Sequence, residues 1–322
     1  MDNFDPTLIS VVMPCYNAAP YVEEAIECVL QQSYRNIELI VVDDGSNDAS
    51  MPIVERLAAD QPGRVTVLHQ TNSGPYAARN HGLTHARGNF VAFLDADDTW
   101  HPDALDQLHG AMAETLADVA YCGWQNVGEA APSTHPYIPP NYAGSDAAAL
   151  FLKSCPWPIN GVLIRRQLVD TLRGFSERLP TAMDYDMWLR MLPLQPTVVR
   201  VPEVLAFYRH YPRGNAHIPR WRQVFDAIAV REDFVRRYPA QVAHLSRAER
   251  DDRVYGSLLP EAYRCHWRRD VDSARRLFRR AARKAEWKAR DAKYILASFL
   301  PASIFESLIR MIDTRRDTRN SI

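Results

Sequence analysis

Three carboxylates lie within four positions of the chain, at Asp95, Asp97 and Asp98, directly after the apolar run 90–94. Like charges this close together repel, so a protein that keeps them is expected to offset them with a positive partner. Hard divalent cations such as Mg²⁺ and Mn²⁺ take oxygen ligands, and Mg²⁺ usually shares its coordination shell between carboxylates and substrate phosphates. The acidic residues therefore predict a metal ion that carries a phosphorylated ligand.

The elements that would position these acids are four short apolar runs rich in β-branched residues. The runs are LISVVM (8–13), IELIVV (37–42), VTVLH (65–69) and FVAFL (90–94). Each run is apolar on both alternating faces, which is typical of strands buried on both sides. Helical patterns lie between and after them, at 20–32, 51–59, 76–86 and 102–112, and 118–124 reads as a further strand. This alternation predicts a mostly parallel sheet flanked by helices, with a surface loop at 128–146.

Polar residues follow all four predicted strands, and in open α/β sheets ligands bind at the carboxyl ends of strands. Tyr16 offers an aromatic face on which a base could stack, and Asp44 offers an acceptor for base or ribose donors. A nucleotide is therefore the phosphorylated ligand that fits best. Taken singly, residues such as Asn17 and Ser46 are equally typical of turns and helix caps. No GxxxxGK[ST] motif is present, which argues against a P-loop nucleotidase.

A second acidic cluster lies in the segment MDYDMWLRM, residues 183–191. Asp184 falls near the start of a predicted helix, where a carboxylate is stabilised by the helix dipole. It could equally be a general base at the mouth of the site. The residues alone leave both interpretations open.

The charge of the chain is divided unequally between its two parts. Residues 1–219 hold 14 Lys and Arg against 25 Asp and Glu, whereas residues 220–322 hold 24 against 14. From 220 onward the pattern is also almost wholly helical. We therefore predict two domains, a nucleotide-binding and catalytic domain at 1–219 and a basic helical region at 220–322.

Five scattered cysteines without CxxC spacing indicate buried thiols in a reducing compartment. The first ten residues have neither the basic nor the apolar segment of a signal peptide, and no run of 18 apolar residues suggests a membrane span. We expect a cytoplasmic protein with no nucleic-acid partner.

Seven segments in a fixed order carry a family resemblance that extends over roughly residues 8–210. They are VVMPCYNAAPYVEEAIECVLQQSY, ELIVVDDGSNDAS, NSGPYAARNHGL, ARGNFVAFLDADD, NGVLIRR, GFSERL and MDYDMWLRM. In this order they resemble an inverting family 2 glycosyltransferase with the GT-A fold, a Rossmann-like sheet flanked by helices, here with a C-terminal helical extension.

The resemblance implies a role for each matching residue. Asp97, with Asp95, would hold Mn²⁺ or Mg²⁺, and Asp184 would be the general base. Binding of the nucleoside diphosphate sugar, a UDP- or dTDP-sugar, would fall to Pro14, Tyr16, Asn17, Asp44, Arg79, Asp95 and Ala96.

Two departures from the family pattern bear on these assignments. The family often has Glu-Asp where this chain has Met183-Asp184, but the Asp is kept. Processive members carry Gln-x-x-Arg-Trp and membrane spans, whereas His217 stands at the Gln position before Arg220-Trp221. The resemblance therefore implies transfer of a single sugar to a glycan or lipid-linked acceptor, as in bacterial surface polysaccharide synthesis.

The acceptor side is the least determined part of the predicted site. Candidates to line it are Trp157, Asn160, Asp186 and the stretch 207–211, while His210 or His217 could add a ligand to the metal. Packing in the core or in a loop is the ordinary alternative for such residues. Two other classes remain open: a sugar-nucleotide pyrophosphorylase, whose Gly-rich basic N-terminal loop is absent here, and a non-catalytic binding protein on the same fold.

The C-terminal region combines basic and apolar residues in a way that suits a membrane surface. RRLFRRAARKAEWKAR (275–290) is followed by ILASFLPASIFESLIRMI (295–312), which is apolar but broken by Pro301, Glu306 and Arg310. Such a segment is too interrupted to span a bilayer and could lie in its interface. The alternative is a solvated helical face, or docking on the acidic part of the chain, so the peripheral membrane location stays an expectation.

Overall fold

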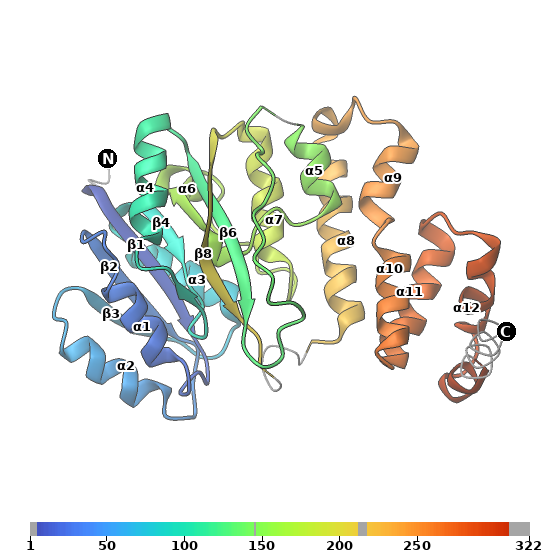
Figure 1. Cartoon of the computed structure of the whole chain (residues 1–322), viewed down its shortest axis with the longest axis horizontal. Coiled ribbons are helices and arrows are strands. Elements are labelled where there is room, and N and C mark those ends of the chain that lie inside the picture. Colours follow the sequence, from blue (N-terminus) through green and yellow to red (C-terminus); the bar gives the residue numbers. More distant parts are fainter. Residues whose placement is uncertain (1–4, 145, 212–217, 309–322) are drawn as a thin grey trace. The chain divides into compact units, whose positions relative to one another are not determined.

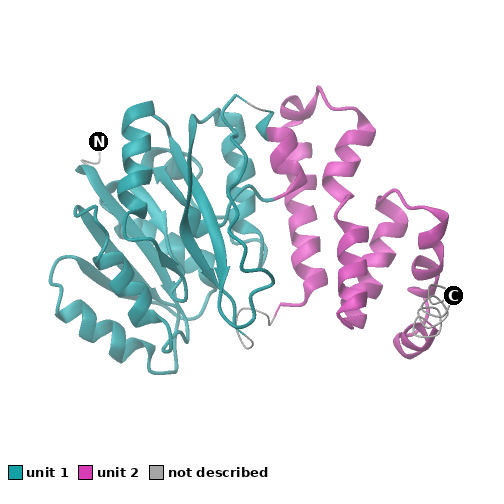
Figure 2. Ribbon diagram, viewed as in Figure 1, with its two compact units in different colours: residues 1–147, 155–214 teal, residues 148–154, 215–322 magenta. Residues whose placement is uncertain are grey.

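The computed structural model describes residues 5–144, 146–211 and 218–308. It divides into two compact units, one formed by residues 1–147 and 155–214 and the other by residues 148–154 and 215–322 (Figure 2). The chain thus passes from the first unit to the second near residue 214, and one short helix of the earlier sequence also belongs to the second unit.

An eight-stranded mixed sheet forms the centre of the first unit (Figure 1). Its order is β3-β2-β1-β4-β7-β6-β8-β5, with β3, β2, β1 and β4 parallel to one another and β7 and β5 antiparallel to their neighbours. The strands are β1 Asp5–Cys15, β2 Ile37–Asp43, β3 Val65–His69, β4 Gly88–Phe93, β5 Thr99–Trp100, β6 Val119–Val127, β7 Val162–Arg165 and β8 Val198–Arg209. The predicted sheet and its five predicted strands are confirmed, whereas β5, β7 and β8 were not predicted.

Helices cover both faces of this sheet. They are α1 Val22–Leu30, α2 Ser50–Ala59, α3 Pro75–His85, α4 Ala104–Thr115, α6 Arg166–Thr171 and α7 Met183–Met191, with 3₁₀ turns η1 Ile159–Gly161 and η2 Leu192–Leu194. Alternate residues of β1 and β2 pack in one core with α1, α2 and α4, while Ile40 and Val42 meet α3 on the other face. The alternation explains why the predicted strands are apolar on both sides.

Helix α3 lies unusually close to the sheet because of one glycine. A Cβ added at Gly82 would lie 2.4 Å from Cγ1 of Val12, so only glycine lets the helix approach β1 this closely. This close packing matters to the site, because α3 also carries Arg79.

The second unit is helical, as predicted for the C-terminal part of the chain. Its elements are α5 Ala147–Lys153, α8 Arg220–Arg237, η3 Pro239–Val242, α9 Arg247–Tyr255, α10 Leu258–Trp267, α11 Val271–Lys284, η4 Ala289–Asp291 and α12 Ala292–Ala297, and residues 302–308 are also helical. Its core includes Leu277 and Phe278 of α11, and the Phe278 ring stacks on Tyr294 with centroids 5.7 Å apart. Within the described ranges, no helix of the chain has the length and apolarity required to cross a bilayer.

Candidate active site

The loops after β1 and β2 are joined by hydrogen bonds at the carboxyl edge of the sheet. Register pairs Cys15 with Asp43, so the two strands end side by side. The backbone N–H of Asn17 donates to Oγ of Ser46 at 3.1 Å, and Oδ1 of Asn17 accepts from the N–H of Asn47 at 2.9 Å. Asn17 has a φ of 49°, in the left-handed region that asparagine tolerates better than most residues. The predicted turn role of Asn17 is therefore real, and it fixes the loop that carries Tyr16.

The side chain of Tyr16 is available to a ligand, whereas Pro14 lies within the sheet. Tyr16 is 51% exposed, which leaves its ring open for stacking. Pro14 is buried within β1, where it pairs in register with Val42, so its side chain is not exposed to a ligand.

Asp44 organises the third loop of this edge. Its carboxylate accepts hydrogen bonds from the N–H of Ser73 at 2.7 Å, from the N–H of Gly74 at 2.8 Å and from Nε2 of Gln70 at 2.8 Å. Gly74, with a φ of 90°, is the residue before α3. Asp44 thus holds the entry to the helix that carries Arg79, a contribution that its expected role toward the base does not include.

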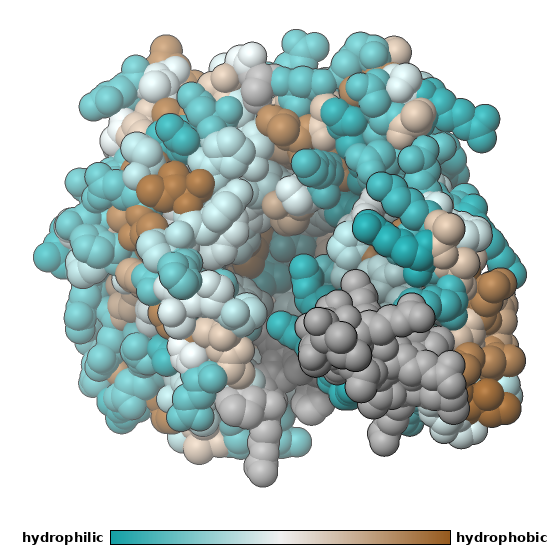
Figure 3. All heavy atoms as spheres, turned by 45° about the vertical axis from the view of Figure 1, so that its right-hand side comes forward, coloured by the Kyte–Doolittle hydropathy of each residue, from teal (hydrophilic) through white to brown (hydrophobic). Residues whose placement is uncertain are grey.

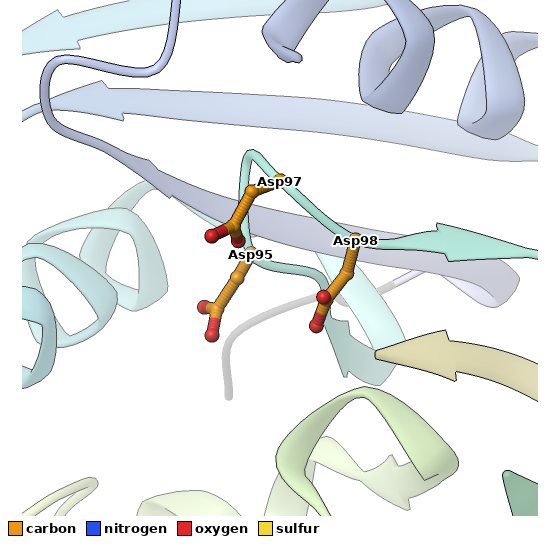
Figure 4. A group of neighbouring side chains, drawn as sticks. All are labelled: Asp95, Asp97 and Asp98. Carbon is orange, nitrogen blue, oxygen red and sulfur yellow. The ribbon is translucent and has the colours of Figure 1, made fainter. Parts of the chain in front are cut away.

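The acidic cluster comprises Asp95, Asp97 and Asp98, in the turn between β4 and β5 (Figure 4). One carboxylate oxygen of each lies within 4.8 Å of the others, and this is the group suited to a metal ion among the residues that the structure describes. Ala96 between them is buried, which fixes the turn in the core. The three acids that are adjacent in the sequence therefore lie together in the structure.

Each acid of the cluster has a different polar partner. Asp95 forms an ion pair with the buried guanidinium of Arg79, and Asp97 accepts a hydrogen bond from the Tyr211 hydroxyl at 3.1 Å. The carboxylate of Asp98, which is 1% exposed, accepts from Nδ2 of Asn160 and from the backbone N–H of Arg209, both at 2.8 Å. Asp98 is thus occupied by protein donors, while Asp95 and Asp97 are more open.

The charges of the cluster are not compensated by protein alone. Burial, together with the charge of Asp95, raises the pKa of Asp97 to about 6. Burial and the charges of Asp97 and Asp95 raise the pKa of Asp98 well above its ordinary value. Raised pKa values mean that the folded protein disfavours the charged forms, as expected where a positive partner is missing.

Asp184 lies close enough to Arg79 and Asp95 for their charges to act on it. It is partly buried in the first turn of α7, and burial is the main cause that raises its pKa. The Arg79 charge acts in the opposite direction, and the charge of Asp95 adds to the rise. Asp184 also raises the pKa of the Tyr76 hydroxyl, after burial. One buried arginine therefore interacts with the acidic cluster and with a separate carboxylate of raised pKa.

Arg79 is held by aromatic rings as well as by Asp95. Its guanidinium lies 5.4 Å from the ring centroid of Tyr76 and 5.8 Å from that of Phe175. Its buried Nε has no hydrogen-bond partner among the described residues. Although burial opposes the charge, Asp95 raises the pKa of Arg79, and the ion pair between them lies within the site.

Asp186 has a structural position. Its two oxygens accept from Arg178 at 2.8 Å and from Arg190 at 2.6 Å, and Arg190 also donates to the carbonyls of Leu172 and Gly174. The buried carboxylate thus ties the 172–178 loop to α7. Asp186, expected near the acceptor, has both oxygens occupied.

Trp157 and Asn160, also expected on the acceptor side, are covered by protein. Trp157 is 1% exposed and stacks on Tyr121 with centroids 4.5 Å apart. Asn160 is fully buried, donates to Asp98, and accepts from Nε1 of Trp100 through its carbonyl at 2.6 Å. Both residues are therefore buried, and Asn160 supports the acidic turn through its hydrogen bond to Asp98.

His210, considered as an extra metal ligand, is not in the acidic cluster. Nε2 of His210 lies 3.1 Å from Oδ1 of Asn126, and the His210 ring packs edge-on against the Tyr208 ring. Burial lowers its pKa. His217 lies outside the described residues.

Sequence reasoning missed how the end of β8 buttresses the acidic turn. Arg209 donates from Nε to the carbonyl of Asp97 at 2.8 Å and from Nη2 to Glu24 at 2.7 Å, and its backbone N–H reaches Asp98. Tyr211 completes the contact with Asp97. The polar stretch 207–211 was the available signal, but nothing in it indicated which loop β8 would lie beside.

Comparison with known proteins identifies the family of the chain. Residues 10–170 match the model of the family Glycosyl transferase family 2. The glycosyltransferase TuaG of Bacillus subtilis is 31% identical over 211 residues, which cover 65% of this chain and 81% of TuaG. Two uncharacterized glycosyltransferases, from Rickettsia felis and Rickettsia conorii, are 30% and 29% identical, and this chain spans about a third of their length.

Solved structures show the same architecture. Staphylococcus aureus TarS 1–349 in complex with UDP-GlcNAc superposes with a TM-score of 0.59 at 20% identity, over 90% of this chain and 79% of that one. The mannosyltransferase PcManGT from Pyrobaculum calidifontis, in complex with GDP-Man and Mn²⁺, gives 0.59 at 19% identity over 95% and 85%. The chain therefore has the GT-A fold. The chain belongs to glycosyl transferase family 2, as the sequence resemblance implied.

Proposed function

We propose that the protein transfers a single sugar from a nucleoside diphosphate sugar to a hydroxyl of an acceptor, with inversion at the anomeric carbon. The observation that carries this proposal is that one buried arginine, Arg79, pairs with Asp95 of the acidic cluster and interacts electrostatically with Asp184. A displacement with inversion needs negative groups on two sides of the reacting carbon, one for the departing diphosphate's cation and one for the acceptor's proton. This chain supplies both within one unit.

The donor would lie along the loops that follow β1, β2 and β4. The exposed Tyr16 ring supports stacking of the base, and Asp44 holds the loop beside it in place. TarS has been solved with UDP-GlcNAc and PcManGT with GDP-Man, so related folds accept different nucleotides. For this chain we expect a UDP- or dTDP-sugar.

The acidic cluster fits a hard divalent cation. Its donors are all carboxylate oxygens within 4.8 Å of one another, and their raised pKa values indicate a net repulsion that a cation would relieve. Since Asp98 is occupied by Asn160 and Arg209, the cation would be held by Asp95 and Asp97. Bound Mn²⁺ or Mg²⁺ supplies positive charge that stabilises the departing diphosphate.

Asp184 would act as the general base. Its carboxylate takes the proton of the acceptor hydroxyl while that oxygen forms a bond to the anomeric carbon. The bond from this carbon to the diphosphate oxygen breaks at the same time, and the nucleoside diphosphate leaves with the electron pair. Burial raises the pKa of Asp184 toward the range in which a base works well near neutral pH. The positive charge of Arg79 acts against this rise.

The acceptor is expected to be a glycan or a lipid-linked glycan in surface polysaccharide synthesis. The name of TuaG refers to teichuronic acid biosynthesis, which supports this class for a relative of the chain. We further propose that the enzyme works in the cytoplasm, peripherally at an anionic membrane where a lipid-linked acceptor would be present.

The test is release of nucleoside diphosphate from a panel of UDP-, dTDP- and GDP-sugars by the purified protein, with Mn²⁺ or Mg²⁺ and with EDTA. We expect release with one nucleotide class, loss of release in EDTA, and loss in Asp184→Asn. Thermal stabilisation by the donor without release, even with candidate acceptors present, would instead support a non-catalytic binding protein. The proposal would be refuted if no donor gave release and no donor stabilised the protein.

A further inference from the structure

The end of the described chain exposes an unusual number of large apolar side chains. Leu296 is 67% exposed, Phe299 50%, Leu300 37% and Ile304 51%. We name these four residues the C-terminal ridge. Figure 3 shows hydrophobic residues gathered at one edge of the face on which the C-terminal unit comes forward.

The ridge is one face of a segment whose other face is packed. Tyr294, Ile295 and Ala297 of α12 are buried, with Tyr294 stacked on Phe278 of α11. The segment is therefore anchored to its unit, so the ridge is not simply the core side of an undocked helix. An exposed group of this kind on an otherwise well-packed unit marks a surface that meets an apolar partner.

Positive side chains border the ridge directly. Arg275 donates to the carbonyl of Leu300 at 2.6 Å, and Arg279 donates to the carbonyl of Ser298 at 2.6 Å. The Arg279 guanidinium also lies 5.7 Å from the ring centroid of Phe299. Neither arginine forms an ion pair with a carboxylate in the parts of the chain that the structure describes. Burial first, and then the neighbouring Arg279, lower the pKa of Arg275, as expected where positive charges are crowded.

Basic residues outnumber acidic residues in the sequence around the ridge. Residues 268–308 contain eleven Lys and Arg against five Asp and Glu. Of the acids, Asp272 is paired with Arg276, and Asp291 accepts from Tyr263 and from the backbone of Lys288. Lys288 and Lys293 are exposed close to the ridge in the chain. The ridge therefore borders on excess positive charge, although Arg280 and Lys284 pair with Glu232 and Arg290 pairs with Asp291.

We infer that the C-terminal ridge inserts into the interface of an anionic membrane while the basic residues around it contact lipid headgroups. Apolar side chains beside excess Lys and Arg are the pattern of segments that lie in a bilayer interface. The excess positive charge favours a membrane with anionic lipids over a neutral one. A protein partner could satisfy the apolar residues, but the crowded charges would then need an acidic rim on that partner.

This inference deepens the peripheral membrane location proposed above by naming the surface that makes the contact, and it needs no donor, acceptor or metal. It assigns the apolar contact to four residues and the headgroup contacts to the basic residues beside them, so vesicle binding tests it independently of glycosyl transfer.

Sedimentation of the full chain with lipid vesicles tests the inference. Vesicles of phosphatidylglycerol mixed with phosphatidylcholine should bind the protein, and vesicles of phosphatidylcholine alone should bind it at least about tenfold more weakly. Salt should release it, since the charged contacts are screened. Equal binding to both vesicles, or none to either, would overturn the inference.

Matched variants locate the contact. Leu296→Glu with Phe299→Glu should weaken binding by about tenfold or more, whereas Leu116→Glu with Leu194→Glu, two exposed leucines of the first unit, should not. Circular dichroism confirms that each variant is folded. Unchanged binding by the folded ridge variant would place the contact elsewhere and refute the proposal.

A second pair of variants avoids any loss of folding at the ridge. Lys288→Glu with Lys293→Glu should abolish the preference for anionic lipid, while Arg35→Glu with Arg56→Glu gives the same change of net charge in the first unit and should retain it. Sedimentation velocity without lipid tests the alternative that a second copy of the chain occupies the ridge. A dimer that the ridge variant dissociates would show that a second copy covers the ridge, and would overturn the membrane assignment.

Discussion

Replacing Asp97 with Asn should stabilise the metal-free protein while abolishing its response to metal. Asn keeps the size of the side chain and can still accept the hydrogen bond from Tyr211. It removes one negative charge from a cluster in which three carboxylates lie within 4.8 Å. Repulsion is therefore relieved without loss of packing.

The size of the effect follows from the pKa of Asp97. Burial and the charge of Asp95 raise it from 3.8 to about 6. A pKa difference of one unit corresponds to about 1.4 kcal/mol, so the shift sets an upper limit of about 3 kcal/mol. Since the repulsion is shared with Asp95 and Asp98, we expect the variant to gain about 1–3 kcal/mol in free energy of unfolding near neutral pH.

The gain should depend on pH with a definite sign. Between pH 3.8 and about 6 the folded state holds more protons on Asp97 than the unfolded state does. The stability of the wild type should therefore fall as the pH rises through this window, and the variant should lack this fall. At about pH 4 the two proteins should be nearly equally stable.

Urea denaturation in EDTA at about pH 8 and about pH 4 measures the difference. Mn²⁺ should then raise the midpoint of the wild type and leave that of Asp97→Asn unchanged. Asp106→Asn is a suitable control, because Asp106 lies in the first turn of α4 and its neutralisation should lower the free energy of unfolding by about 0.3–1 kcal/mol. A variant at position 97 that is less stable than the wild type in EDTA at about pH 8 would refute the reasoning.

Three further substitutions separate the roles of other carboxylates. Asp184→Asn should reduce turnover by about 10²-fold or more with donor affinity unchanged, measured by steady-state kinetics and calorimetry; normal turnover would remove it as the base. Asp44→Asn should cost about 1–3 kcal/mol in urea denaturation and raise the KM for donor, because the 73–74 loop loses its charged acceptor; an unchanged KM would separate this loop from the donor site. Asp186→Asn should cost about 3–5 kcal/mol, since two arginines lose their partner, and the kcat of the folded fraction should stay near that of the wild type. A stable but inactive Asp186→Asn would show that this residue, and not only Asp184, takes part in the reaction.

The sequence by itself determined the apolar strands and the acids that follow them. β1, β2, β3, β4 and β6 were predictable because each contains a short apolar run, but the expectation of burial on both sides is wrong for β3, which lies at the edge of the sheet and is only partly buried. The acidic turn was predictable because local sequence alone brings Asp95, Asp97 and Asp98 together. The resemblance to the family rests on the same local segments, in their order along the chain.

Only the tertiary structure decided what stands around those acids. The ion pair of Arg79 with Asp95 joins α3 to the turn after β4, and Arg209 joins the end of β8 to the same turn from more than a hundred positions away in the chain. The short strands β5 and β7 have too few residues to show a period, so their pairing depends on neighbours in space.

Burial likewise separated residues that look alike in the sequence. Asp184 and Asp186 stand two positions apart on α7, but the helical turn directs Asp186 to Arg178 and Arg190 and leaves Asp184 beside Arg79. A local pattern records which side chains can ionise, whereas their partners and their burial, which set their pKa values, are fixed only when distant segments pack together.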